Sequence, residues 1–237
     1  MDIIDPAYIV GSFDYVIRYL PVTLGLTLAS VLLGTVLGLF SAVAEILRLP
    51  VFRQIARGYV LVCRSLPNMV LLYLVYYGLP ILFLVLHDKT GIHVPYEHVP
   101  ALSIAILGLG LHTGAYLSEN FRAAIQSVRT GQVEAALALG MTWPQVFRRV
   151  IFPQASVFAL PLFANQFLNT MKSTSICFVI TVIELFGAAK LFCEDNSQYF
   201  EAYITVACLY WAMGAIFETI FSRLEFHLSR FKRGNVL

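Results

Sequence analysis

Long runs of apolar residues, separated by shorter polar segments, make up most of this 237-residue chain. Five runs are long enough to cross a hydrocarbon core of about 30 Å as helices, because a helix rises about 1.5 Å per residue. The pattern therefore predicts an all-α membrane protein with one transmembrane domain over residues 1–237. We place its five spans at about 20–47, 69–86, 99–117, 171–189 and 203–221.

The fourth apolar run, over 155–189, is too long for one simple span and contains several polar residues. We expect the span proper at 171–189. The part before it is expected to enter the bilayer depth under a cover of protein, because lipid leaves polar groups unsatisfied. In the second span, we expect Pro80 to interrupt the helix.

Small residues within the apolar runs are expected to serve packing. Gly34 and Gly38 in the first span, and Gly110 and Gly114 in the third, are spaced as contacts that let membrane helices approach closely. The cysteines lie far apart without a C-x-x-C pair, so we interpret them as small packing residues. They are Cys63, Cys177, Cys193 and Cys208.

The composition agrees with a membrane protein and argues against a soluble one. Hydrophobic residues make up 59% of the chain and charged residues 13%, with a mean hydropathy of +0.77. Such a chain has too little polar surface to cover a soluble globule. The composition therefore predicts that the protein is embedded in the lipid bilayer. The formal net charge of +2 is too small to indicate nucleic-acid binding.

The distribution of arginine and lysine predicts the orientation. Four basic residues follow the first span, four lie in the polar region 120–153 and four in the C-terminal tail, whereas the opposite side carries three. Basic residues are retained on the cytoplasmic side of membrane proteins. We therefore expect a multi-pass protein with its N-terminus outside, its C-terminus in the cytoplasm and residues 120–153 on the cytoplasmic face.

The spacing of histidines and serines along the sequence does not indicate a catalytic or metal site. Three of the five histidines lie in the polar connection 87–98, without the spacing of a helical metal-binding face. The scattered serines and histidines offer no nucleophile–base pair, which argues against a membrane enzyme. We therefore expect neither catalytic residues nor metal ligands on this chain.

The polar region 120–153 is predicted to form a helical hairpin. Good helix formers run from Val133 to Leu139, and Gly140 suits the positive φ at a helix C-terminus. The segment 142–145 (T-W-P-Q) matches a capping box, which predicts a second short helix. We expect that helix to end before Pro153.

The hairpin resembles the EAA motif of ATP-binding-cassette importer permeases. Glu134, Ala135 and Ala136 are followed after three residues by Gly140, and after nine more by V-I-F-P at 150–153, where the family has I-x-L-P. In that family the motif forms a cytoplasmic coupling helix seated on an ATPase subunit. The alternative is an ordinary helical hairpin between membrane segments.

Further matches cover nearly the whole chain and resemble permeases for polar amino acids. Ser65, Leu66 and Ser173 depart from the usual R-G-T-P and K-D-T-S, and the loss of the acidic residue beside Lys172 leaves the charge type of the substrate open. The matching segments are 64–67 (R-S-L-P), 116–122 (Y-L-S-E-N-F-R), 152–155 (F-P-Q-A) and 172–175 (K-S-T-S).

This resemblance implies a five-span permease domain in the cytoplasmic (inner) membrane of a bacterium. It implies three protein partners: an ATPase subunit that carries ATP and Mg, an extracytoplasmic solute-binding protein, and a second permease that is identical or similar. The sequence has no G-x-x-x-x-G-K-[ST] motif, so no cofactor is expected on this chain and a separate ATPase must supply the energy.

Polar residues within the spans are candidates for a substrate path, because they are costly at membrane depth unless they face a cavity or a partner. Two sets share an i, i+4, i+7 spacing that places them on one helix face. Amides, hydroxyls and a cation would suit the charged groups of an amino acid. The sets are His112, Tyr116 and Glu119, and Asn165, Asn169 and Lys172, with Thr174 just beyond.

Two alternatives remain open from the residues themselves. The polar faces could serve only to hold helices together, for example through an ion pair of Lys172 with Glu119 or Glu184. The protein could also be an ion-coupled secondary transporter of small polar solutes, although such proteins typically show internal repeats and the sequence has none that we detect.

Overall fold

The structure, a computed structural model, describes residues 5–92, 95, 98–194 and 197–234, and in these ranges every regular element is a helix. The prediction of an all-α protein is confirmed. The elements are α1 (Pro6–Val16), a 3-10 turn (Ile17–Tyr19), α2 (Leu20–Ile46), α3 (Pro50–Ser65), α4 (Asn68–Thr90), α5 (Ala101–Gln126), α6 (Thr130–Ala138), α7 (Trp143–Val146), a π-helical turn (Phe147–Ile151), α8 (Phe152–Ser173), a 3-10 segment (Thr174–Ile180), α9 (Leu185–Cys193) and α10 (Tyr199–Gly234).

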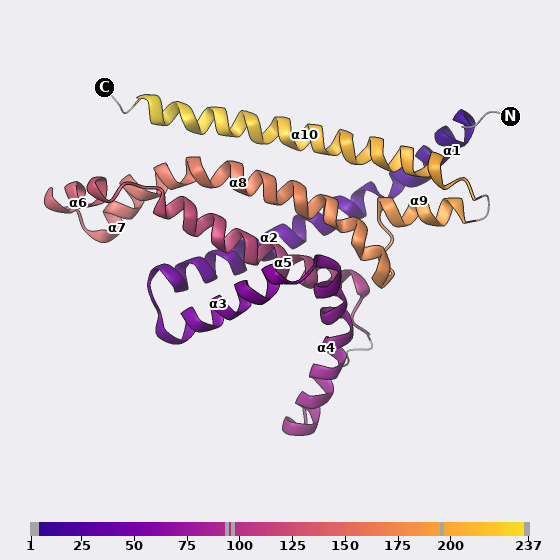
Figure 1. Cartoon of the computed structure of the whole chain (residues 1–237), viewed down its shortest axis with the longest axis horizontal. Coiled ribbons are helices and arrows are strands. Elements are labelled where there is room, and N and C mark those ends of the chain that lie inside the picture. Colours follow the sequence, from indigo (N-terminus) through magenta and orange to yellow (C-terminus); the bar gives the residue numbers. More distant parts are fainter. Residues whose placement is uncertain (1–4, 93–94, 96–97, 195–196, 235–237) are drawn as a thin grey trace.

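In the described part of the chain, five helical stretches are long and apolar enough to cross a membrane. Their bounds are Pro6–Ile46, Asn68–Thr90, Ala101–Gln126, Trp143–Ile180 and Tyr199–Ser229. Figure 1 shows α2, α5, α8 and α10 running along the long axis, with α6 and α7 at one end and α1 and α9 at the other. Helix α4 leaves this bundle at a steep angle, and most of its apolar side chains are exposed.

Helices α2 and α5 pack closely against each other, and the glycine pairs make this approach possible. A Cβ at Gly38 would lie 2.9 Å from the Cβ of Leu117 and 3.0 Å from the carbonyl oxygen of Gly114. A Cβ at Gly34 would similarly meet Thr113 at 2.8 Å. Real side chains do not fit at such distances, so the predicted role of these glycines in close packing is confirmed.

The fourth span differs from the prediction. Residues 171–189 do not form one helix: α8 ends at Ser173, a 3-10 segment follows, Thr181 adopts a left-handed φ of 68°, and α9 begins at Leu185. The long apolar helix precedes this break, and the prediction placed the span too late because hydropathy gives no weight to a turn. The break places short helical segments beside the buried ends of α2 and α10.

Two prolines break the chain less than expected. Helix α4 continues through Pro80. Pro153 lies in the first turn of α8. The second hairpin helix, α7, ends at Val146, before Pro153 as expected, but a π-helical turn continues the helical backbone into α8. Proline is tolerated in the first turn because its missing N–H has no partner to lose, and the wider turn accommodates its ring.

The polar connection after the first span contains a helix that the sequence analysis did not anticipate. Helix α3 is amphipathic: Ala56, Val60 and Cys63 are buried at i, i+4, i+7 spacing, whereas Arg57 and Arg64 are exposed. The Tyr59 hydroxyl donates to the Leu111 carbonyl at 2.7 Å, and burial raises the pKa of Tyr59, so this hydroxyl remains a donor. This contact attaches α3 to α5.

Candidate functional site

A cavity of about 430 Å³ opens between α4, α5, α8 and the 3-10 segment. It brings together four of the residues that the sequence predicted for a substrate path, namely His112, Tyr116, Asn169 and Lys172. The two helix faces inferred from spacing therefore meet at one place. The other lining residues are Asn68, Gln166, Ser173, Ser175 and Ile176.

Two aromatic rings form the α5 wall of this cavity. The rings of His112 and Tyr116 lie with centroids 4.9 Å apart, one turn from each other on α5. The guanidinium of Arg64, from the end of α3, lies 5.3 Å from the centroid of the Tyr116 ring. This cation–π contact orients the ring and places a positive charge at the edge of the cavity.

Lys172 and Asn169 provide the polar groups of the opposite wall. Both side chains are exposed, and among the described residues Lys172 has no carboxylate within 4 Å. An ion pair of Lys172 with Glu119 or Glu184 is therefore absent from this structure. The ammonium group is free to meet an anionic group that enters the cavity.

Asn68 is a lining residue that sequence analysis missed. Both its amide oxygen and its amide nitrogen are buried, and neither has a hydrogen-bond partner among the described residues. Buried polar atoms without partners are uncommon in proteins and call for an explanation, such as a ligand that the structure does not contain. One feature of the sequence could have identified Asn68: it directly follows Pro67, where a helix starts and a side chain can project from the helix end.

Gln166 was also missed, for a reason of helix geometry. Gln166, Asn169 and Ser173 have i, i+3, i+7 spacing and line the cavity together with Lys172, so the lining extends to one side of the predicted face. Asn165 is exposed and does not line the cavity. The spacing of polar residues along α8 does not by itself determine which of its neighbouring faces lines the cavity.

Glu119 lies in a neighbouring cavity of about 590 Å³ that shares Tyr116 with the first. Its carboxylate pairs with Arg122 on the same helix and lies 3.8 Å from Arg64. This carboxylate is thus already compensated by two guanidinium groups. It lies next to the predicted path and is not part of the cavity that holds Lys172.

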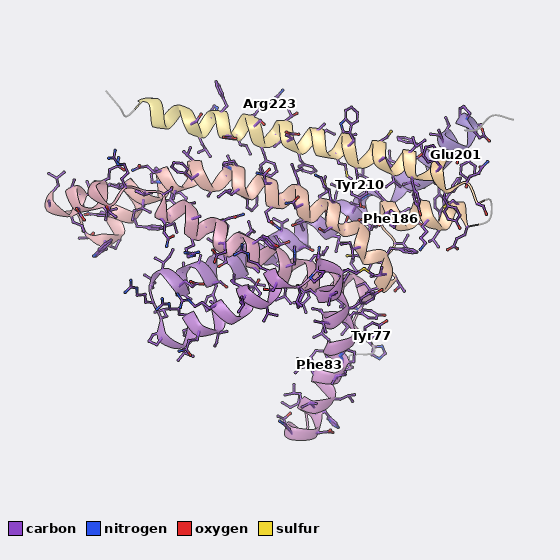
Figure 2. All side chains as sticks on the ribbon, in the orientation of Figure 1. Tyr77, Phe83, Phe186, Glu201, Tyr210 and Arg223 are labelled. Atoms are coloured by element: carbon purple, nitrogen blue, oxygen red, sulfur yellow. The ribbon has the colours of Figure 1, made fainter. Side chains whose placement is uncertain are left out.

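Thr174 faces the opposite side, toward α10. Its hydroxyl lies 3.0 Å from the hydroxyl of Tyr210, which donates to Glu184 Oε2 at 2.7 Å. Glu184 caps α9 by accepting from the backbone N–H of Gly187 at 2.9 Å. Figure 2 shows Tyr210 between α10 and α8. We call Thr174, Tyr210 and Glu184 the buried triad.

The hairpin that carries Glu134, Ala135 and Ala136 forms the end of the molecule marked by α6 and α7 (Figure 1). Gly140 has a φ of 81°, as predicted, and Gln145 Oε1 accepts from the Thr142 N–H at 2.9 Å. Ala136 is buried, whereas Glu134 and Ala135 are exposed.

Large apolar side chains of the hairpin also face outward. Leu139 is 81% exposed and Trp143 is 63% exposed. Next to them, Phe147 is exposed as well. A contiguous exposed apolar surface at a helix hairpin is typical of a protein-binding site.

Comparison with known proteins places the chain in a defined group. The model of the family described as binding-protein-dependent transport system inner membrane component matches residues 34–230. The probable amino-acid permease protein YxeN of Bacillus subtilis is 37% identical over 230 residues, which cover 97% of this chain and 98% of YxeN. The probable amino-acid ABC transporter permease protein PatM of Vibrio harveyi is 37% identical over 86% of this chain and 91% of PatM.

A solved structure agrees with these sequence relatives. The crystal structure of an amino acid ABC transporter with histidines contains a chain that superposes with a TM-score of 0.80 at 32% identity. The match covers 94% of this chain and 99% of that chain. The five-span arrangement and the hairpin described above are thus features of a known fold.

Proposed function

Because this chain belongs to the family of binding-protein-dependent transport system inner membrane components, we propose that it is the permease subunit of an ATP-driven importer that carries a polar amino acid. The observation that carries the substrate class is the cavity between α4, α5 and α8. Among the described residues, Lys172 has no ion-pair partner there and the Asn68 amide has no hydrogen-bond partner. The relatives are named as amino-acid permeases, which supports the same class.

The lining residues suit both charged groups of an amino acid. Lys172 and the amides of Asn68 and Asn169 would take the α-carboxylate, because a charge-assisted hydrogen bond favours an ionised acceptor. The faces of the His112 and Tyr116 rings would take the α-ammonium through cation–π attraction. In the part of the chain that the structure describes, no Asp or Glu lines this cavity, so the rings are the groups that attract a cation there.

Energy for transport would come from a separate ATPase subunit with bound ATP and Mg. The exposed face of the hairpin, with Glu134, Leu139 and Trp143, is the surface on which that subunit would dock. Closure of the ATPase pair would move the hairpin, and α8 would carry the motion to the cavity because a continuous helical stretch runs from Trp143 to Ile180.

The other exposed surfaces of the chain suit the two remaining partners, a second permease and a solute-binding protein. The exposed apolar side chains of α4 suit a contact with a second permease, identical or similar, which would close the cavity from its open side. The arginine distribution favours the hairpin end in the cytoplasm of a bacterial cell and the N-terminus outside. A solute-binding protein would then dock at the end formed by α1 and α9.

Co-purification and uptake test this function. A tag on this chain should retain an ATPase subunit, and proteoliposomes with that complex and its binding protein should accumulate a polar amino acid only with internal ATP. Uptake that follows an ion gradient without an ATPase would instead establish an ion-coupled secondary transporter and refute the proposal.

Two hairpin variants test the coupling. Glu134→Arg reverses a charge on the exposed face, and Gly140→Pro removes the positive φ that the turn needs. Both should insert normally but lose most of the ATPase stimulation by loaded binding protein. Glu225→Arg, an exposed charge reversal on α10, is the matched control and should keep it. Full stimulation in both hairpin variants would show that the hairpin does not couple the subunits.

A further inference from the structure

A second cavity lies at the hairpin end of the molecule, where the end of α2, the start of α3 and the last turns of α5 meet. Its volume is about 240 Å³, and it is separate from the cavity that holds Lys172. Its polar lining residues are Arg48, Arg53, Arg57, Arg122, Glu45 and Gln126. We call this cavity the arginine cavity.

The charges that line the arginine cavity do not balance. Four guanidinium groups face one carboxylate, Glu45, which lies 3.5 Å from Arg57 Nε. Glu119 compensates Arg122 from outside the cavity and is shared with Arg64. Among the described residues, Arg48 and Arg53 have no carboxylate within 4 Å. The cavity therefore keeps an excess of positive charge.

Hydrogen-bonding capacity is also left over. The Nε atoms of Arg53 and Arg122 are buried, and neither donates to an acceptor in the part of the chain that the structure describes. A buried donor without an acceptor destabilises the fold, so an acceptor that enters the cavity and takes these hydrogen bonds is favoured. Two unused donors in a positively charged cavity favour an anion with several oxygens.

The backbone places a third arginine in the same wall. Arg48 has a φ of 52°, a left-handed conformation that is unfavourable for a non-glycine residue. This residue forms the turn between α2 and α3. The strained turn brings its side chain into the lining of the cavity beside Arg53.

The surroundings indicate where the anion comes from. Leu47, Leu49, Val51 and Phe52 are exposed on the same turn and the start of α3, next to the arginines. A free anion gains nothing from an apolar rim, whereas a lipid would lay its acyl chains against it. Guanidinium groups bind phosphate oxygens in pairs, and the positive-inside distribution places this end at the leaflet that is rich in anionic lipids.

We propose that the arginine cavity binds the phosphate headgroup of an anionic phospholipid. The phosphate oxygens accept from Arg48, Arg53 and Arg122, and the acyl chains lie against the exposed apolar residues of the α2–α3 turn. The lipid would link α2, α3 and α5, the last of which carries His112 and Tyr116, and so stabilise the permease fold from its hairpin end.

The test measures thermal stability of the purified protein, with the subunits that accompany it, in a neutral detergent. Phosphatidylglycerol should raise the melting temperature of the wild type, while phosphatidylcholine and inorganic phosphate at matched ionic strength should not. Arg48→Gln and Arg53→Gln should each weaken the apparent phosphatidylglycerol affinity about tenfold, as expected for one charge-assisted hydrogen bond. Arg223→Gln, on α10 toward the same end (Figure 2), should keep the wild-type affinity.

Several outcomes would overturn the proposal. An equal effect of both lipids on the wild type would show that no anionic headgroup is recognised. An equal effect of inorganic phosphate would mean that the site takes a free anion and not a lipid. Unchanged affinity in both arginine variants would place the lipid elsewhere. If these variants do not fold, native mass spectrometry of the wild type decides: it should retain phosphatidylglycerol, and a protein without it contradicts the proposal.

Discussion

Lys172 and Thr174 lie two residues apart, yet they belong to different parts of the molecule. Two residues on a helix are separated by about 200° of rotation, so one side chain faces the cavity and the other faces α10. Beside the cavity, Lys172 and Asn169 are exposed, and the Asn68 amide has no hydrogen-bond partner among the described residues. In the buried triad, by contrast, each hydroxyl and each carboxylate oxygen has a partner.

The difference shows how to separate binding groups from structural ones at membrane depth. Both kinds of group are polar and energetically costly in lipid, so the sequence alone does not distinguish them. A structural polar group forms hydrogen bonds inside the protein that offset the cost of its burial. A binding group keeps its hydrogen-bonding capacity unused until the ligand binds. The partners of each polar atom are therefore more informative than its polarity.

The largest effect is expected from breaking the buried triad. Glu184→Ala removes the acceptor of both Tyr210 and the Gly187 N–H, and leaving buried donors unpaired should lower the free energy of unfolding by about 1–3 kcal/mol. The yield of folded protein and its melting temperature in detergent should both fall.

Two control variants sharpen this result. Glu184→Gln keeps an acceptor oxygen and should be milder, and Glu194→Ala, an exposed acid just after α9, should have no effect. If Glu184→Ala melts at the wild-type temperature while uptake is lost, the triad would belong to the transport path and the distinction between the two faces would fail.

A smaller and purely functional effect is expected from Lys172→Met. No carboxylate in the described part of the chain is orphaned by this change, so melting temperature and ATP turnover should persist. Uptake should fall by about tenfold or more, because a charge-assisted hydrogen bond contributes about 1.5–3 kcal/mol.

Lys190→Met is the matched control for Lys172. Its ammonium lies 4.8 Å from the centroid of the Phe178 ring and does not line the cavity, so uptake should be retained. Loss of assembled protein in Lys172→Met, with normal uptake per remaining complex, would identify Lys172 as a brace between helices.

The smallest effect is expected from Asn169→Ala. Removing one side-chain hydrogen bond in a membrane interior costs about 1 kcal/mol, which should raise the KM for uptake about fivefold and leave the maximal rate unchanged. Asn165→Ala, one turn away and outside the cavity, should leave the KM unaltered. Equal KM values for the two variants would contradict the distinction between Asn169, which lines the cavity, and Asn165, which does not.

The sequence by itself determined the features that depend on local chemistry. Runs of apolar residues specify membrane helices because the bilayer admits few other structures, and Gly140 specified the turn of the hairpin because few other residues adopt its φ. The glycine pairs of α2 and α5 indicated close contact before their partners were known.

Only the tertiary structure decided which polar groups meet. The i, i+4, i+7 spacing left neighbouring faces of α8 almost equivalent, and packing against α10 decided that Asn169 and Gln166 line the cavity while Thr174 does not. Asn68 joined the site from a distant segment, and the break at Thr181 created α9 beside α10. Spacing along a helix fixes relative angles, but the absolute rotation of that helix is set by contacts between residues far apart in the chain.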